Sequence, residues 1–116
     1  MSIMGIGVDI EDIARFRKLP YAKNKSFYGK VFTKKEIVYC LKKPDPYPSF
    51  AARFAAKEAV IKALPSLPAG GVKNFHAVEV VMKKNKPLVL LRGHETHISL
   101  SHDNEKALAF VVLLGR

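Results

Sequence analysis

Cysteine, long apolar runs and acidic side chains are all scarce in this chain of 116 residues. The single cysteine, Cys40, excludes an internal disulfide, which fits a reducing compartment. It stands in the stretch YCLKK with no base beside it, so we expect it to pack inside a helix and not to act as a nucleophile. No apolar run approaches the roughly 20 residues that span a bilayer. The first twelve residues, MSIMGIGVDIED, turn acidic where a signal peptide needs its apolar stretch, so we expect a soluble, cytoplasmic protein without a membrane span.

The sequence also contains no repeats, no low-complexity tracts and no long linkers, so we expect a single domain over residues 1–116. A chain this short can bury only about two-thirds of the surface that it exposes when unfolded. Sharing surface with other subunits would therefore help to stabilise it.

Ten Asp and Glu residues face twenty Lys and Arg residues, which gives a net charge of +10 and a pI near 9.9. Such an excess attracts polyanions: nucleic acid, an anionic membrane surface, a phosphate-rich cofactor or an acidic protein. Composition alone favours nucleic acid, and a small basic nucleic-acid-binding module stays open as one alternative. Against it, the chain has no RGG tract and no platform of interleaved aromatic and basic residues, so we expect no nucleic-acid partner.

The order of hydrophobic periods predicts one strand, then helices, then a run of strands. Residues 3–9 read as a buried strand, and residues 10–18 as a helix with four apolar residues inward (Ile10, Ile13, Ala14 and Phe16). Thr33 and Glu36 fit a capping box at the start of a helix that runs to residue 43. Residues 21–26 and 65–71 read as loops, and strands are expected at 76–82, 87–91, 96–101 and 107–114, with turns at 84–87 and 102–106. This order is typical of an α+β fold with helices packed on a mostly antiparallel sheet.

The longest predicted helix, residues 50–64 with Ser49 as its N-cap, is apolar on both faces and should therefore be buried. It nevertheless carries Arg53, Lys57, Glu58 and Lys62. Glu58 and Lys62 are spaced i, i+4, so they form either an ordinary surface ion pair or a carboxylate and an ammonium beside a phosphate site.

Asp9 ends an apolar stretch that begins at Gly5 and Gly7. The two glycines resemble the start of a dinucleotide-binding fingerprint, but the third glycine is missing, and close packing of the strand explains them more simply. Asp9 caps the next helix or binds a metal ion. Mg²⁺ typically uses one or two protein carboxylates together with substrate phosphates and waters, a demand that Asp9 and Glu58 together would meet.

The histidines suggest no centre of their own. His94 and His97 are spaced i, i+3 but lack the further ligands of a zinc site, and His76 is expected to be structural. Ser101-His102-Asp103 has the letters of a catalytic triad, but neighbouring residues of a strand point to opposite faces.

Three stretches together resemble one family, the holo-acyl-carrier-protein synthases: GIGVDIEDIARF at 5–16, RFAAKEAVIKAL at 53–64 and ISLSHDNEKALAFVV at 98–112. The resemblance implies the 4′-phosphopantetheinyl transferase fold, a homotrimer with active sites between subunits, and a magnesium-dependent reaction. That reaction moves 4′-phosphopantetheine from coenzyme A to a serine of apo-acyl carrier protein and releases 3′,5′-ADP, in fatty acid or polyketide biosynthesis. A non-catalytic relative that binds coenzyme A stays open as the other alternative.

The resemblance also implies residue roles. Asp9 and Glu58 correspond to the metal ligands, and Lys62 to a catalytic lysine on the phosphates of coenzyme A. His102 corresponds to a histidine near the nucleotide, and Arg53 and Lys57 are expected to contact phosphate. Arg15, turned away from the metal, would dock the acidic carrier together with Arg17 and Lys18. The base that deprotonates the carrier serine is either Glu58 or a metal-bound water that Glu58 orients.

Overall fold

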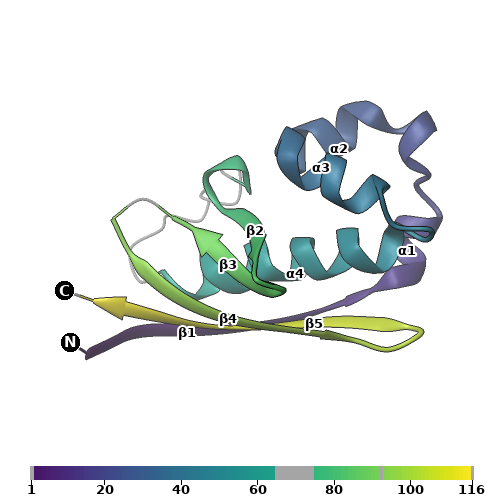
Figure 1. The fold of residues 1–116 in the computed structure, drawn as a ribbon. Helices are drawn as coiled ribbons and strands as arrows, with labels where there is room; N and C mark the ends of the chain where they lie inside the picture. Colours follow the sequence, from purple (N-terminus) through teal and green to yellow (C-terminus); the bar gives the residue numbers. More distant parts are fainter. Residues whose placement is uncertain (1, 65–74, 92, 116) are drawn as a thin grey trace.

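The computed structural model describes residues 2–64, 75–91 and 93–115 (Figure 1). Strand β1 (Ser2–Asp12) leads into the short helix α1 (Ile13–Arg17), a 3₁₀ turn η1 (Tyr21–Lys23), and helices α2 (Lys25–Val31), α3 (Lys34–Leu41) and α4 (Tyr47–Ala63). The chain ends with β2 (Glu79–Lys83), β3 (Lys86–Leu90), β4 (Glu95–His102) and β5 (Lys106–Gly115). The expected loop at residues 65–71 lies outside the described residues.

The strands form a three-stranded sheet in the order β1-β5-β4 and a separate hairpin of β2 and β3. All described pairings are antiparallel, with Asp9 opposite Ala109 and His102 opposite Ala107. Helix α4 lies across one face of the three-stranded sheet, and the smaller helices stand above one end of α4 (Figure 1). The predicted α+β class is confirmed, although the strands make two sheets where one was expected.

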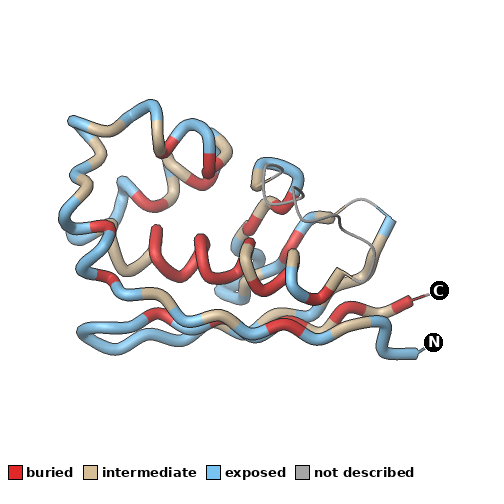
Figure 2. Tube along the Cα trace, turned by 180° about the vertical axis from the view of Figure 1, so that it is seen from behind, coloured by how far each residue is buried: buried red, intermediate tan, exposed pale blue. Residues whose placement is uncertain are grey.

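Helix α4 is the centre of the core, as its apolar faces predicted (Figure 2). Its buried aromatic end packs with Phe16, Tyr28 and Phe32, and its alanines pack on β1 and β5. The predicted N-cap is wrong, because the helix begins at Tyr47, before Ser49. Pro48 fits inside the first turn, where a backbone N–H has no helical partner to lose, so the prolines do not delay the helix.

The glycines of β1 allow the strand to lie directly against α4. A Cβ at Gly5 would stand 1.9 Å from the carbonyl oxygen of Ala63, and one at Gly7 would stand 1.8 Å from that of Ala59. The strand rises about 6.6 Å from Gly5 to Gly7, and the helix rises about 6.0 Å from Ala59 to Ala63. Because these distances nearly match, each glycine lies against a helix carbonyl. Close packing therefore explains the glycines.

Three further local predictions are wrong. The strand does not end at residue 9 but continues to Asp12, because β5 pairs with it as far as Lys106. Ile10 and Ala14 are exposed, and only Ile13 and Phe16 of the predicted helix face are buried. The segment 21–26 is not a loop throughout, since α2 begins at Lys25 and buries Tyr28 and Val31.

The capping box and the role of Cys40 are confirmed. The Glu36 N–H donates to Thr33 Oγ1 at 3.2 Å, and the Thr33 N–H donates to Glu36 Oε1 at 2.8 Å. Cys40 is buried in the aromatic core, and burial raises the pKa of its thiol to about 12, so it stays protonated and inert. Among the described helices, none combines the length and the apolar character needed to cross a membrane.

Candidate functional site

The close contact of β1 with α4 brings together a group of charged side chains that we call the carboxylate cluster: Asp9, Glu11 and Glu58 with Lys62 and Arg15. Lys62 Nζ lies 2.9 Å from Asp9 Oδ1 and donates a second hydrogen bond to the Val8 carbonyl at 3.3 Å. Arg15 Nη1 lies 3.1 Å from Glu11 Oε1. Because Asp9 and Glu11 are two residues apart on one strand, both carboxylates face α4.

Burial and mutual repulsion make the negative charges of the carboxylate cluster unfavourable. Burial raises the pKa of Glu58, and the Asp9 carboxylate raises it further, while Lys62 and Arg15 oppose the rise. Burial and the adjacent Asp9 raise the pKa of Glu11 to about 7. Asp9 in turn raises the pKa of Lys62, which keeps that ammonium charged. The cluster therefore favours binding of a further positive charge or a proton.

Lys62 does not form the ordinary ion pair expected with Glu58. Among the described residues its only ion-pair partner is Asp9, which lies 53 positions earlier in the chain. Half of the Lys62 side chain remains exposed, whereas Asp9 is nearly covered. The Lys62 ammonium, on its flexible side chain, is thus held at the exposed edge of the carboxylate cluster.

The donor set suits a magnesium ion completed by substrate. The described residues contain no group of three or more His, Cys, Asp or Glu with the spacing of a metal centre. Magnesium does not require one, because it keeps waters and substrate phosphate oxygens around one or two carboxylates. Asp9 Oδ2 is buried and has no hydrogen-bond partner among the described residues, so one oxygen is free to serve as a ligand.

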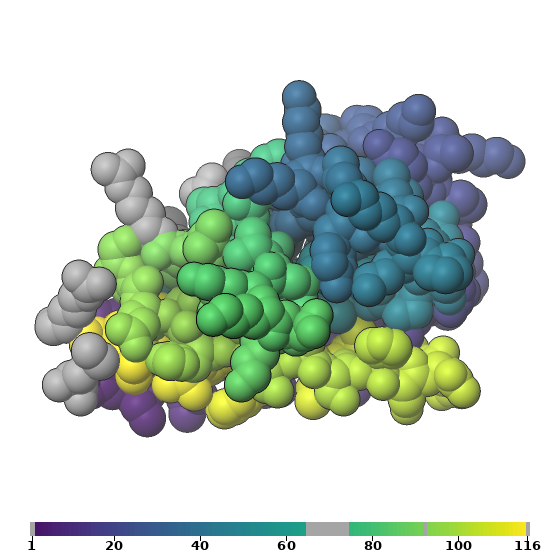
Figure 3. Space-filling view, viewed as in Figure 1, coloured from purple at the N-terminus to yellow at the C-terminus, as the bar shows by residue number. Residues whose placement is uncertain are grey.

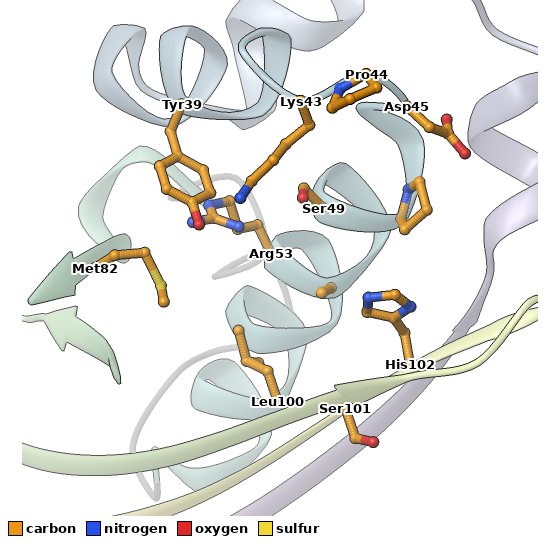
Figure 4. Close-up of a pocket in the computed structure, with 12 residues that line it drawn as sticks. Tyr39, Lys43, Pro44, Asp45, Ser49, Arg53, Met82, Leu100, Ser101 and His102 are labelled. Carbon is orange, nitrogen blue, oxygen red and sulfur yellow. The ribbon is translucent and has the colours of Figure 1, made fainter. Parts of the chain in front are cut away.

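A second region is a cavity with a volume of about 550 Å³ between α3, α4, β2 and β4 (Figure 4). We call it the nucleotide cavity after the expectation that the sequence resemblance gave for His102, which lines it. It contains Arg53 and His102 of the predicted set, together with Lys43, Ser49 and Tyr39. Figure 4 shows His102 extending toward α4 while its neighbour Ser101 points away, as strand alternation requires. The letters of a triad therefore do not form one.

Arg53 carries buried donors that lack a partner among the described residues. Its guanidinium lies 4.1 Å from the centre of the Tyr39 ring, and the Lys43 ammonium lies 4.9 Å from the same ring. The residue is only 3% exposed, and its Nε and Nη2 have no hydrogen-bond partner among the described residues. Buried donors of this kind are costly unless a ligand satisfies them.

The other predicted residues lie elsewhere. Lys57 is fully buried, and its ammonium is 2.8 Å from Glu36 Oε1, so the structure does not bring it to a phosphate-binding surface as expected. Arg15 is not turned away from the carboxylate cluster, because it bonds Glu11 and stacks near Phe54. Arg17 makes two hydrogen bonds to Asp45, at 2.9 and 2.7 Å, and Lys18 is exposed beside it.

His76 makes a structural contact, as expected, whereas His97 makes an exposed ion pair. His76 Nε2 contacts the Gly29 carbonyl at 2.6 Å, and His97 pairs with Glu95 at 3.0 Å. In the described part of the chain neither takes part in a metal-binding group.

The two regions lie at opposite edges of the three-stranded sheet. Asp9 is on the edge strand β1, and His102 is on the other edge strand β4, with β5 between them. One chain therefore brings Asp9, Glu58 and Lys62 together in one region, and Arg53 and His102 together in another. It does not bring the two regions together.

Sequence reasoning missed Glu11, Tyr39 and Lys43. The alternation Asp9-x-Glu11 would have revealed the first, had the strand been extended to Asp12. Tyr39 and Lys43 carry no signal in the sequence, because the cavity forms only where α3 meets β2 and β4.

Comparison with known proteins finds similarity over nearly the whole chain. A sequence model of the 4′-phosphopantetheinyl transferase superfamily matches residues 5–111. The holo-[acyl-carrier-protein] synthase of Chlamydia felis is 42% identical over 98% of this chain and 99% of its own. The crystal structure of the synthase from Neisseria meningitidis has a TM-score of 0.83 at 28% identity, covering 98% of this chain and 100% of that one. The synthase from Bacillus anthracis, solved in complex with CoA (3′,5′-ADP), has a TM-score of 0.82 at 33% identity, covering 96% of each chain.

Proposed function

Because the chain belongs to the 4′-phosphopantetheinyl transferase superfamily, as a holo-[acyl-carrier-protein] synthase, we propose that its carboxylate cluster performs a magnesium-dependent transfer. The reaction moves 4′-phosphopantetheine from coenzyme A to a serine hydroxyl of apo-acyl carrier protein and releases 3′,5′-ADP. The observation that carries this proposal is the meeting of Asp9, Glu58 and Lys62, with Asp9 Oδ2 left unpaired among the described residues.

Asp9 and Glu58 are the proposed magnesium ligands, with the Glu11 carboxylate beside them. The ion, when bound, would neutralise the pyrophosphate of coenzyme A and the charge that develops on the leaving 3′,5′-ADP. Lys62 adds a second positive charge from the protein. Its exposed ammonium leaves Asp9 for a phosphate oxygen when the substrate enters, which requires only a change of side-chain rotamer.

Glu58 is the candidate base for the carrier serine. Its raised pKa brings it nearer to neutral pH, which makes it a better proton acceptor than an ordinary carboxylate. A water oriented by Glu58 is the alternative route for the same proton. Either route gives the serine oxygen the electron pair with which it attacks phosphorus.

The nucleotide cavity is the proposed site for the 3′,5′-ADP end of coenzyme A. Arg53 and Lys43 offer donors to phosphate, and His102 faces them from β4. Its volume of about 550 Å³ lies within the range of small-molecule sites, and its cationic lining suits a phosphorylated nucleotide.

We propose a homotrimer in which each active site is shared between subunits. A single chain holds the carboxylate cluster and the nucleotide cavity at opposite edges of the three-stranded sheet, and we propose that one coenzyme A molecule reaches the cluster of one subunit and the cavity of its neighbour. The face of the sheet opposite α4 is also apolar and uncovered, with five side chains between 39% and 59% exposed (Ile6, Val8, Ile10, Leu108 and Phe110). Covering this face would remove an apolar patch that monomers rarely expose.

The acidic carrier protein is proposed to dock at α1. Arg15 and Arg17 lie on this helix and Lys18 is its C-cap. Arg15 bonds Glu11 of the carboxylate cluster, so these charges would steer the carrier serine toward the cluster. We propose that modification of a carrier in this way serves fatty acid or polyketide biosynthesis, in the cytoplasm where coenzyme A and carrier meet.

The test is to incubate the protein with coenzyme A, Mg²⁺ and an apo carrier protein and to measure carrier mass. We expect complete conversion to the pantetheinylated form. A mixture of Asp9→Asn and His102→Ala chains, each inactive alone, should regain part of the activity after mixing, because shared sites then contain one intact set. Activity that never exceeds the sum of the two variants would contradict the shared site.

A further inference from the structure

Glu36 and Lys57 form a buried charge network that the proposed chemistry does not use. Glu36 Oε1 accepts from the Thr33 N–H and lies 2.8 Å from Lys57 Nζ, and Glu36 Oε2 accepts from the Val80 N–H at 2.9 Å. Lys57 Nζ also donates to the carbonyls of Phe75 at 3.0 Å and Val78 at 2.5 Å. Both side chains are fully buried, so one network joins α3, α4 and the start of β2.

Stability alone is a weak reason for such a network. Removing two charges from water costs several kcal/mol per ion, and apolar replacements of a buried ion pair are often neutral or stabilising. Burial lowers the pKa of Lys57, and the Glu36 carboxylate opposes that shift by favouring the charged ammonium. Unlike apolar side chains, the network makes directional hydrogen bonds, because each oxygen and each N–H fixes the position of one neighbouring group.

Each element in the network also supplies a residue of the nucleotide cavity. Tyr39 follows Glu36 by one turn of α3, and Arg53 precedes Lys57 by one turn of α4. Met82 follows Val80 by two residues on the same face of β2. A hollow of about 260 Å³ is lined by Tyr39, Arg53, Val80 and Met82, together with Lys35 and Val81. Figure 3 shows the side chains of α3 beside those of the β2–β3 hairpin.

We propose that the Glu36–Lys57 pair is a positioning device for nucleotide binding. It fixes the spacing of α3, α4 and β2, so that the Tyr39 ring holds Arg53 with Nε and Nη2 directed to the ligand. This inference rests on the proposed function of the nucleotide cavity. It assigns no chemical step to Lys57, in contrast to the phosphate contact that the sequence predicted.

The test is the double variant Glu36→Met/Lys57→Met, which removes both charges and leaves no unpaired ion. Binding of 3′,5′-ADP is measured by calorimetry, and KM for coenzyme A and kcat are measured separately. We expect the dissociation constant and KM to rise about tenfold while kcat at saturating coenzyme A stays within about twofold, because the carboxylate cluster is untouched. Val31→Ala is the matched control: it loosens the same core from α2 without removing a member of the network, and should leave 3′,5′-ADP binding unchanged.

Unchanged 3′,5′-ADP affinity in the folded double variant, or equal weakening in Val31→Ala, overturns the positioning role. If the double variant does not fold, hydrogen exchange of the wild type decides. Coupling is reciprocal, so 3′,5′-ADP should slow exchange of the Val80 N–H, and no change there overturns the proposal. Failure of the wild type itself to bind 3′,5′-ADP would instead remove the proposed nucleotide site, which separates the two failures.

Discussion

Gly7→Ala tests whether the contact between β1 and α4 builds the carboxylate cluster. The new Cβ would stand 1.8 Å from the Ala59 carbonyl oxygen, and Ala59 is part of a helix backbone that has no rotamer to change. Carbon and oxygen need more than about 3 Å, so the strand would have to retreat by over about 1 Å. Asp9 follows Gly7 by two residues and would retreat with it from Lys62.

The cost follows from this displacement. Overpacking a core typically costs about 1–3 kcal/mol, and a collision with backbone lies at or above the upper end of that range. At about 2.1 cal/mol/K per residue, a loss of 3 kcal/mol lowers the melting temperature of a chain this long by about 12 °C. We expect that shift by calorimetry at fixed protein concentration, together with a loss of most transferase activity below the melting point.

Gly29→Ala is the control. Gly29 lies within α2, and a Cβ there would meet nothing within 4 Å of the described atoms. Alanine should therefore raise stability by about 0.5–1 kcal/mol and leave activity unchanged. A Gly7→Ala protein as stable and active as the wild type would refute the packing argument.

Three further perturbations test the cluster and the assembly. The raised pKa of Glu11 means that, without divalent cations, the free energy of unfolding falls as pH rises from about 4.5 to about 7. In denaturant titrations, Glu11→Gln should therefore be more stable than the wild type by about 1–3 kcal/mol at pH 8 and equally stable at pH 4. Arg15→Ala removes an exposed charge from the proposed docking surface, so KM for the carrier should rise severalfold while KM for coenzyme A stays nearly unchanged; an unchanged carrier KM would contradict the docking role. Phe110→Glu places a charge on the exposed apolar face and should give monomers by light scattering, whereas an intact trimer would place the interface elsewhere.

The sequence predicted elements whose signals are local. Thr33 and Glu36 lie three residues apart, and their capping box formed as expected. The buried character of α4 also followed from its own apolar faces. The end of β1 did not, because Ile10 and Ile13 have helical spacing and only pairing with β5, about a hundred residues later, keeps residues 10–12 extended. Helix α2 was missed because Gly29 interrupts it and the Asn24 side chain does not cap it.

The same division between local sequence signals and tertiary packing holds for the site. Asp9, Glu58 and Lys62 were assigned from motifs, and the structure brings them together although Asp9 and Lys62 are 53 positions apart. Lys57 belongs to the same motif, yet its ammonium is buried by Glu36, a contact that depends on how α3 packs. The sequence specifies which charges α4 carries, whereas tertiary packing decides which of them reach the surface.

The most direct test of the magnesium-dependent transfer is the rate of carrier pantetheinylation as a function of Mg²⁺ concentration, followed by intact-protein mass for the wild type and for Asp9→Asn. We expect no turnover of the wild type in excess EDTA and saturable activation by added Mg²⁺. The Asp9→Asn protein, folded by circular dichroism, should need far more Mg²⁺ or stay inactive. Full wild-type turnover in EDTA, or an Asp9→Asn curve that overlies the wild-type curve, would contradict the assignment of the carboxylate cluster as the catalytic metal site.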